Sequence, residues 1–175
     1  MNAQTANVDE PRQTAGRQKK KVLIVDDDGS VRDAISSVLQ EAGYEVLQAG
    51  DGQEALAQFD PKQIDLVLLD LGLPNKSGWD IFAGFTSKNP TLPIIIITGQ
   101  AGQSEMAMAA GVGALMEKPL DAAHLLQIMR ELLIESDEAR LRRLCGYGQD
   151  GHYSPVTMRY VRDGSSSVAV NYNPK

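Results

Sequence analysis

The fold is decided by the stretch Val22-Leu23-Ile24-Val25-Asp26-Asp27-Asp28, an apolar run of strand length that ends in three consecutive carboxylates. A short, uninterrupted apolar run is typical of a parallel strand that is buried on both faces. Charged residues are rarely placed directly after such a strand for packing reasons. The stretch therefore predicts a buried strand with a polar site at its carboxyl end.

Three further apolar runs end in the same way. Asp70 follows the run 64–69, Thr98 follows the run 94–97, and Lys118 follows the run 114–116 after one intervening residue. In an open parallel sheet, ligands bind in the crevice outside the carboxyl ends of the strands. We therefore expect one small site to which several strands contribute: Asp26, Asp27, Asp70, Thr98 and Lys118.

Helical patterns alternate with these runs. The apolar stripe that follows Ser30 predicts a first helix that ends near Gly43, and Asp121 precedes the strongest helical stripe, which extends to Leu133. Shorter helices are expected over about 52–59, 79–85 and 104–110, and a further strand over 44–49. Five strands alternating with five helices predict a doubly wound α/β fold with helices on both faces of a parallel sheet.

Composition narrows the class of protein. The chain has 175 residues and a net charge of −6, and residues 22–135 hold six basic against seventeen acidic side chains, which disfavours nucleic-acid binding by this part. One cysteine, Cys145, permits no internal disulfide. With no apolar stretch long enough for a membrane span or a secretory signal, we expect a cytoplasmic protein.

The two ends of the chain differ from its centre. Residues 1–20 are polar and without apolar periodicity, which predicts a disordered N-terminal tail before a domain over 21–135. In the C-terminal extension, 136–175, the sequence suggests a short helix over 139–144 and a possible hairpin from 156–161 and 167–172. This extension is too small for its own core, so it either packs on the domain or stays disordered. It contains no recognition helix, so no direct DNA binding is expected.

The predicted site has a chemistry of its own. Carboxylates within a few ångströms of one another either raise a pKa or require a cation, and a hard ion such as Mg²⁺ suits a small open acidic pocket. A backbone carbonyl near Gly72 would add another oxygen ligand. An aspartate such as Asp70 can act as a nucleophile and form an acyl phosphate, whose oxygens Lys118 and Thr98 would bind.

These motifs together resemble the receiver domain of two-component response regulators, over about residues 20–135. The resemblance implies a flavodoxin-like sheet with strand order 2-1-3-4-5. It also implies a phosphoacceptor at Asp70 that catalyses its own phosphorylation and dephosphorylation rather than acting as an enzyme on other substrates. The implied metal ligands of Mg²⁺ are Asp26, Asp27, Asp70 and the carbonyl of Gly72. The implied switch residues are Thr98 and Lys118. The resemblance further implies that the peptide bond between Lys118 and Pro119 is cis.

The same resemblance implies a partner and an output. The phosphoryl donor would be a phosphohistidine on a sensor histidine kinase or a phosphotransfer protein. Phosphorylation would change a surface presented to a downstream protein, or the phosphoryl group would be relayed onward. Two features depart from the family: Leu115 stands where most receivers have an aromatic residue, and the interval from Thr98 to Lys118 is about two residues short and rich in glycine and alanine.

Two other functions remain open. A scaffold that binds partners without phosphorylation is compatible with Leu115, although the intact acidic and switch residues count against it. A phosphatase of the haloacid dehalogenase type would also use an aspartate nucleophile, but it needs a second acid two residues later, where this chain has Gly72.

Overall fold

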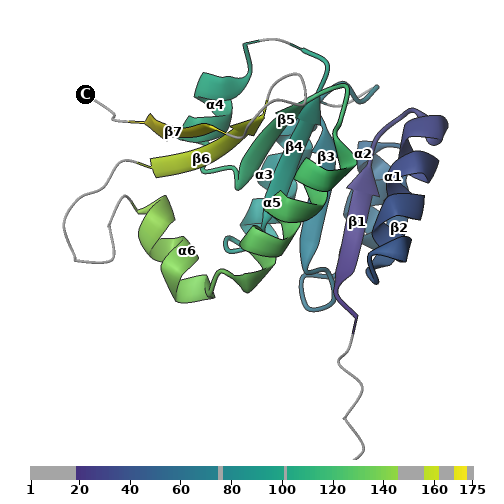
Figure 1. The fold of residues 1–175 in the computed structure, drawn as a ribbon, viewed down its shortest axis with the longest axis horizontal. Helices are drawn as coiled ribbons and strands as arrows, with labels where there is room; N and C mark the ends of the chain where they lie inside the picture. The colour runs from purple at the N-terminus through teal and green to yellow at the C-terminus, as the bar shows by residue number, and fades with distance from the viewer. Residues whose placement is uncertain (1–18, 75–76, 101, 146–155, 162–167, 173–175) are drawn as a thin grey trace, which may run out of the picture.

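The computed structural model describes residues 19–74, 77–100, 102–145, 156–161 and 168–172. Strands and helices alternate along the chain, as expected (Figure 1). The first five strands are β1 (Lys21–Val25), β2 (Glu45–Ala49), β3 (Leu66–Asp70), β4 (Ile94–Thr98) and β5 (Ala114–Glu117). The helices between and after them are α1 (Gly29–Glu41), α2 (Gly52–Gln58), α3 (Gly78–Lys88), α4 (Ser104–Ala109) and α5 (Ala122–Ile134).

These strands form a parallel sheet in the order β2-β1-β3-β4-β5, which confirms the predicted topology. The register aligns the carboxyl ends of the central strands: Val25 lies opposite Leu69, and Asp70 lies opposite Ile97. Thr98 in turn lies opposite Glu117, the residue before Lys118. The polar residues that end the strands are therefore brought to one edge of the sheet.

Both faces of the sheet are covered, because alternate residues of each buried strand point to opposite sides. Leu23 and Val25 face the core formed with α2, α3 and α4, whereas Val22 and Ile24 face the core formed with α1 and α5. The strands β3 and β4 are buried along their whole length. This double cover explains why the sequence shows continuous apolar runs rather than alternation.

Side-chain caps start several helices. Asp121 caps α5, as predicted, by accepting a hydrogen bond from the backbone N–H of His124 at 2.7 Å. The prediction that α1 starts at Ser30 was wrong: Asp28 is the N-cap and accepts from the N–H groups of Ser30 and Val31. Aspartate and serine are both favoured caps, and the acceptor two residues earlier captures the first free N–H groups.

The sheet does not stop at β5. After α6 (Asp137–Leu144), β6 (Val156–Val161) pairs in parallel with β5, and β7 (Val168–Tyr172) pairs antiparallel with β6. Among the described residues, the sheet therefore consists of the five expected strands and the two strands of the C-terminal hairpin. The predicted hairpin packs on the domain by strand pairing, because the free edge of β5 offers unpaired backbone groups to a β-prone segment.

The side chain of Arg140 connects α6 to the domain by hydrogen bonds. It is buried and donates hydrogen bonds to the carbonyl oxygens of Thr91 and Leu132, and its Nε donates to the Glu135 carboxylate at 3.1 Å. A buried guanidinium is tolerated only when its donors are paired in this way.

The N-terminal tail and the absence of a membrane span were also predicted from the sequence. The predicted disorder of residues 1–20 falls almost wholly on residues 1–18, which lie outside the described residues. Within the described ranges, no helix is long and apolar enough to cross a membrane.

Candidate functional site

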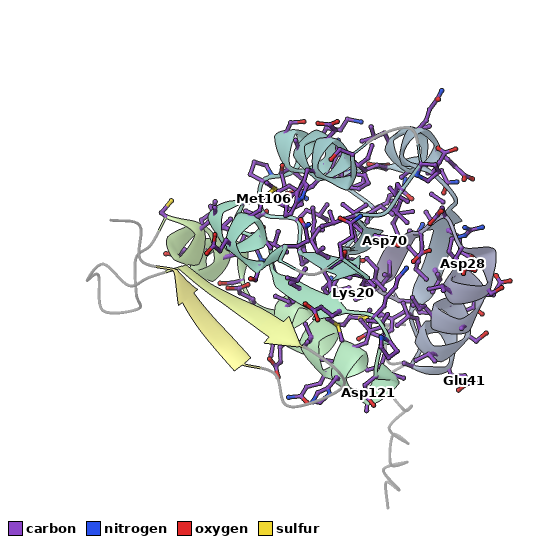
Figure 2. All side chains as sticks on the ribbon, turned by 90° about the horizontal axis from the view of Figure 1, so that it is seen from above. Lys20, Asp28, Glu41, Asp70, Met106 and Asp121 are labelled. Carbon is purple, nitrogen blue, oxygen red and sulfur yellow. The ribbon has the colours of Figure 1, made fainter. Side chains whose placement is uncertain are left out.

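Asp26, Asp70 and Lys118 meet at the carboxyl ends of β1, β3 and β5. Figure 2 looks down on this end of the sheet, with Asp70 near the middle of the molecule and Asp28 to one side, where α1 begins. Both Asp26 and Asp70 are buried, with 2% and 6% of their surfaces exposed. Two buried carboxylates side by side repel each other unless a cation compensates them.

Lys118 supplies that compensation. Its Nζ lies 2.7 Å from Oδ2 of Asp26 and 2.6 Å from Oδ2 of Asp70, so one ammonium bridges both carboxylates. Burial disfavours the charged amine, but the hydrogen bonds and charges of Asp26 and Asp70 outweigh this cost and raise the pKa of Lys118 above its ordinary value. Lys118 is therefore held as a cation at the centre of the site.

Backbone N–H groups hold the other carboxylate oxygens. Oδ1 of Asp26 accepts from the N–H of Asp28 at 2.9 Å, and Oδ1 of Asp70 accepts from the N–H of Gly72 at 2.8 Å. A Cβ at position 72 would lie 3.4 Å from Oδ1 of Asp70, so the chain passes directly beside this carboxylate. Each acid thus has a fixed orientation before any ligand binds.

Asp27 completes an acidic cluster. Its carboxylate is exposed, and one ligand atom from each of Asp26, Asp27 and Asp70 lies within 4.8 Å of the others. Hard divalent cations prefer carboxylate oxygens, and Mg²⁺ commonly uses one or two of them together with water and phosphate oxygens. The donor set therefore fits Mg²⁺. Asp28 is not part of the cluster, because its carboxylate caps α1 instead.

Thr98 lies at the end of β4 and is fully buried. Its Oγ1 accepts a hydrogen bond from the N–H of Gln100 at 3.0 Å, and its carbonyl accepts from the N–H of Lys118 at 2.9 Å. The backbone of Thr98 thus positions Lys118 directly. The bond between Lys118 and Pro119 is cis, as the resemblance implied.

Two contacts near the site were not anticipated from the sequence. Nη1 of Arg32 donates to the carbonyl of Asp26 at 2.6 Å, while its guanidinium lies within 3.5 Å of the position that a Cβ of Gly50 would take. Nε1 of Trp79 donates to Oε1 of Gln103 at 3.3 Å. Arg32 is four residues after Asp28, one helical turn along α1, so this spacing could have indicated that it lies near Asp26. No sequence signal indicates the pairing of Trp79 with Gln103.

Leu115, the departure from the expected aromatic, is buried in the core that faces α2, α3 and α4. An aliphatic side chain there has no polar atom with which to reach the site. Leu115 therefore contributes only to packing.

Comparison with known proteins agrees with this geometry. The family model described as the response regulator receiver domain matches residues 22–130. Among curated proteins, the chain is 34% identical over 114 residues to the sensory transduction protein RegX3 of Mycolicibacterium smegmatis, covering 64% of this chain and 50% of that protein. It is also 34% identical over 115 residues to the CAI-1 autoinducer sensor kinase/phosphatase CqsS of Vibrio cholerae, covering 63% of this chain and 17% of that protein.

Solved structures are similar over the same part. A CheY-like response regulator receiver domain protein from Methanospirillum hungatei matches with a TM-score of 0.64 and 32% identity, over 71% of this chain and 98% of that one. The response regulator TrrA of Thermotoga maritima, solved in complex with Mg²⁺ and BeF, matches with a TM-score of 0.60 and 31% identity, over 65% of this chain and 98% of that one. The chain spans half or less of the length of the two curated relatives above. From the matched family model and the strand order and acidic cluster that accompany it, we conclude that this chain belongs to the response regulator receiver domain family.

Proposed function

We propose that this protein is a two-component response regulator that accepts a phosphoryl group on Asp70 in a Mg²⁺-dependent reaction. The observation that carries the proposal is the bridge from Lys118 to both Asp26 and Asp70, which combines a buried, oriented carboxylate with a fixed positive charge. Positioning and charge stabilisation are the main requirements of phosphoryl transfer.

Each residue then has a defined part. A carboxylate oxygen of Asp70 attacks the phosphorus of a phosphohistidine, the phosphorus–nitrogen bond breaks, and the imidazole leaves with its electron pair. The Lys118 ammonium follows the charge that moves onto the phosphoryl oxygens, and the Thr98 hydroxyl donates to one of them. Mg²⁺, held by Asp26, Asp27, Asp70 and the Gly72 carbonyl, would neutralise further charge on the same oxygens.

The donor we propose is a sensor histidine kinase or a phosphotransfer protein. Receiver domains act with sensor kinases, and the relative CqsS is itself a sensor kinase that contains a matching segment. Phosphorylation would then alter a surface that a downstream protein recognises. The haloacid dehalogenase alternative finds no support in the site, since Gly72 has no side chain that could act as the second acid beside Asp70.

The test is intact-mass analysis after incubation with acetyl phosphate and Mg²⁺. We expect a gain of about 80 Da that requires Mg²⁺ and is absent in Asp70→Asn, because the amide cannot act as the nucleophile. Asp65→Asn is a matched control, since Asp65 lies at the opposite end of β3 and pairs with Lys20. If the folded wild type gains no mass under any condition, the scaffold function replaces this proposal.

A further inference from the structure

The loop after β4 carries a chain of hydrogen bonds that begins at Thr98. Oγ1 of Thr98 accepts from the N–H of Gln100 at 3.0 Å, and Oε1 of Gln100 accepts from Nε2 of Gln103 at 3.5 Å. Oε1 of Gln103 then accepts from the indole Nε1 of Trp79 at 3.3 Å. The first bond uses the backbone of Gln100 and the second uses its side chain, so three hydrogen bonds and the Gln100 side chain itself connect a buried hydroxyl of the site with an aromatic ring on α3.

The polarity of this chain is fixed by its aromatic end. An indole N–H can only donate, so Gln103 must turn its amide oxygen toward Trp79 and its NH₂ toward Gln100. The Gln100 side chain must then present its own oxygen. At the other end, Thr98 uses its oxygen as an acceptor and keeps its hydroxyl proton available for a different partner.

The Trp79 ring, at the end of this series of hydrogen bonds, is held in place by packing. It lies in the first turn of α3, is half-buried against the core, and packs edge to face on Phe82 with ring centroids 5.8 Å apart. Gln103, in contrast, lies at the start of α4, where its carbonyl accepts from the N–H of Ala107 at 3.0 Å. The hydrogen bonds therefore tie the beginning of a short helix to a fixed ring.

We infer that Gln100, Gln103 and Trp79 are positioning residues that hold the Thr98 hydroxyl in its resting orientation, and that Trp79 reports when this hydroxyl is drawn away. The inference rests on the proposed phosphorylation of Asp70. To donate its free hydroxyl proton to a phosphoryl oxygen on Asp70, the Thr98 side chain turns toward Asp70, and this movement takes Oγ1 away from the N–H of Gln100. The change passes to Gln103 and releases the indole.

Trp79 would therefore respond to changes at Asp70 as an aromatic residue, although Leu115, at the position where most receivers have an aromatic residue, is aliphatic and buried. The series of hydrogen bonds also indicates where the change goes next. α4 lies against β6 and β7, so a shift at the start of α4 acts on the C-terminal hairpin as well (Figure 1). The output surface we infer therefore includes α4 and the hairpin.

Trp79 is the single tryptophan of the chain, so its emission reports this contact without substitution. We would titrate the protein with beryllofluoride and Mg²⁺, follow Trp79 emission, and follow binding independently by the rise in melting temperature. In the wild type we expect both signals to change together. Binding without any change in emission would overturn the inference and leave the proposed function intact.

Variants at Gln100 and Gln103 separate the two halves of this hydrogen-bond series. Gln100→Ala keeps the backbone N–H for Thr98 and leaves Gln103 its bond to the indole, but it removes the side-chain oxygen that accepts from Gln103. We expect resting emission like the wild type, binding retained, and the emission change lost. Gln103→Leu removes both side-chain bonds of Gln103 and leaves the N–H of Gln100 on Thr98. In this variant a movement of Thr98 no longer breaks a bond of Gln103, so we expect beryllofluoride to bind about two- to tenfold more tightly, the range for a net cost of one ordinary hydrogen bond.

Gln58→Leu is the matched control, since Gln58 is exposed on α2 and donates to Glu54 in its own helix. It should keep wild-type emission and wild-type binding. An emission change in Gln100→Ala as large as in the wild type would show that the signal does not pass through the Gln100 side chain, and would overturn the inference. Failure of Asp70 to gain mass with acetyl phosphate is a separate result, and it contradicts the proposed function itself.

Discussion

At the scale of single residues, the three clustered aspartates are compensated unequally. Lys118 pairs with Asp26 and Asp70, whereas Asp27 is exposed and has no cationic partner among the described residues. Asp27 therefore adds repulsion when no metal is bound and attraction when one is. Its effect on stability should change sign with Mg²⁺.

Asp27→Asn tests this directly. In EDTA we expect the variant to be more stable than the wild type by about 0.5–1 kcal/mol, because one of three like charges is removed. With Mg²⁺ we expect the order to reverse, and the apparent affinity for Mg²⁺ to fall on the order of tenfold or more. Thermal unfolding over a range of Mg²⁺ concentrations measures both effects.

Asp28→Asn is the control for this experiment. It removes the same charge one residue away, but asparagine caps a helix as well as aspartate does, and Asp28 is outside the acidic cluster. Its response to Mg²⁺ should match the wild type. An equal loss of response in both variants would contradict the assignment of Asp27.

Much of the site could be predicted at this scale, because each main residue either ends a buried strand or follows one directly. Asp26, Asp70, Thr98 and Lys118 needed only the rule that parallel strands share a carboxyl edge. Arg32 and the pairing of Trp79 with Gln103 could not be predicted, since they depend on side-chain rotamers across segments that are distant in sequence.

At the scale of elements, periodicity predicted the type of each helix and strand better than its ends. Helix α5 began where its cap indicated, but α1 began before Ser30 because Asp28 offers a competing cap. The role of α6 was not predictable at all. Its sequence has few apolar residues, and the carbonyls of Thr91 and Leu132 accept hydrogen bonds from one of its charged side chains, Arg140.

Arg140→Ala should therefore release α6. The substitution leaves the carbonyls of Thr91 and Leu132 without this donor and the Glu135 carboxylate without the guanidinium. We expect a cost of about 2–3 kcal/mol. Hydrogen exchange should show α6 amides losing protection by roughly 30- to 150-fold, while β1 and β3 amides change little.

Arg130→Ala is the matched control, because Arg130 is an exposed arginine on α5. We expect it to change stability by less than about 0.5 kcal/mol and to leave exchange in α6 as in the wild type. If Arg140→Ala exchanged no faster than Arg130→Ala, the buried arginine would not be what holds α6 in place.

At the scale of the whole molecule, the C-terminal hairpin was predicted as a hairpin but not as part of the sheet. Its β-prone segments indicate strands, whereas docking depends on which sheet edge is free and how the chain returns to it. The edge strand β5 is free until β6 covers it, and α5 and α6 carry the chain back so that β6 runs parallel to β5.

Removal of residues 146–175 tests whether this added pairing matters. The five-stranded part should still fold, because a solved receiver from Methanospirillum hungatei is covered over 98% of its length by 71% of this chain. Without β6, the outward N–H and C=O groups of β5 lose their partners. We expect β5 amides to exchange about tenfold faster or more, and the shortened protein to self-associate through the exposed edge.

Exchange in β1, which lies between β2 and β3, is the internal control, and light scattering after size exclusion measures self-association. Unchanged exchange in β5 would mean that the hairpin spends little time on the sheet in solution. Faster exchange without self-association would mean that α4 and α6 alone keep the edge from other chains.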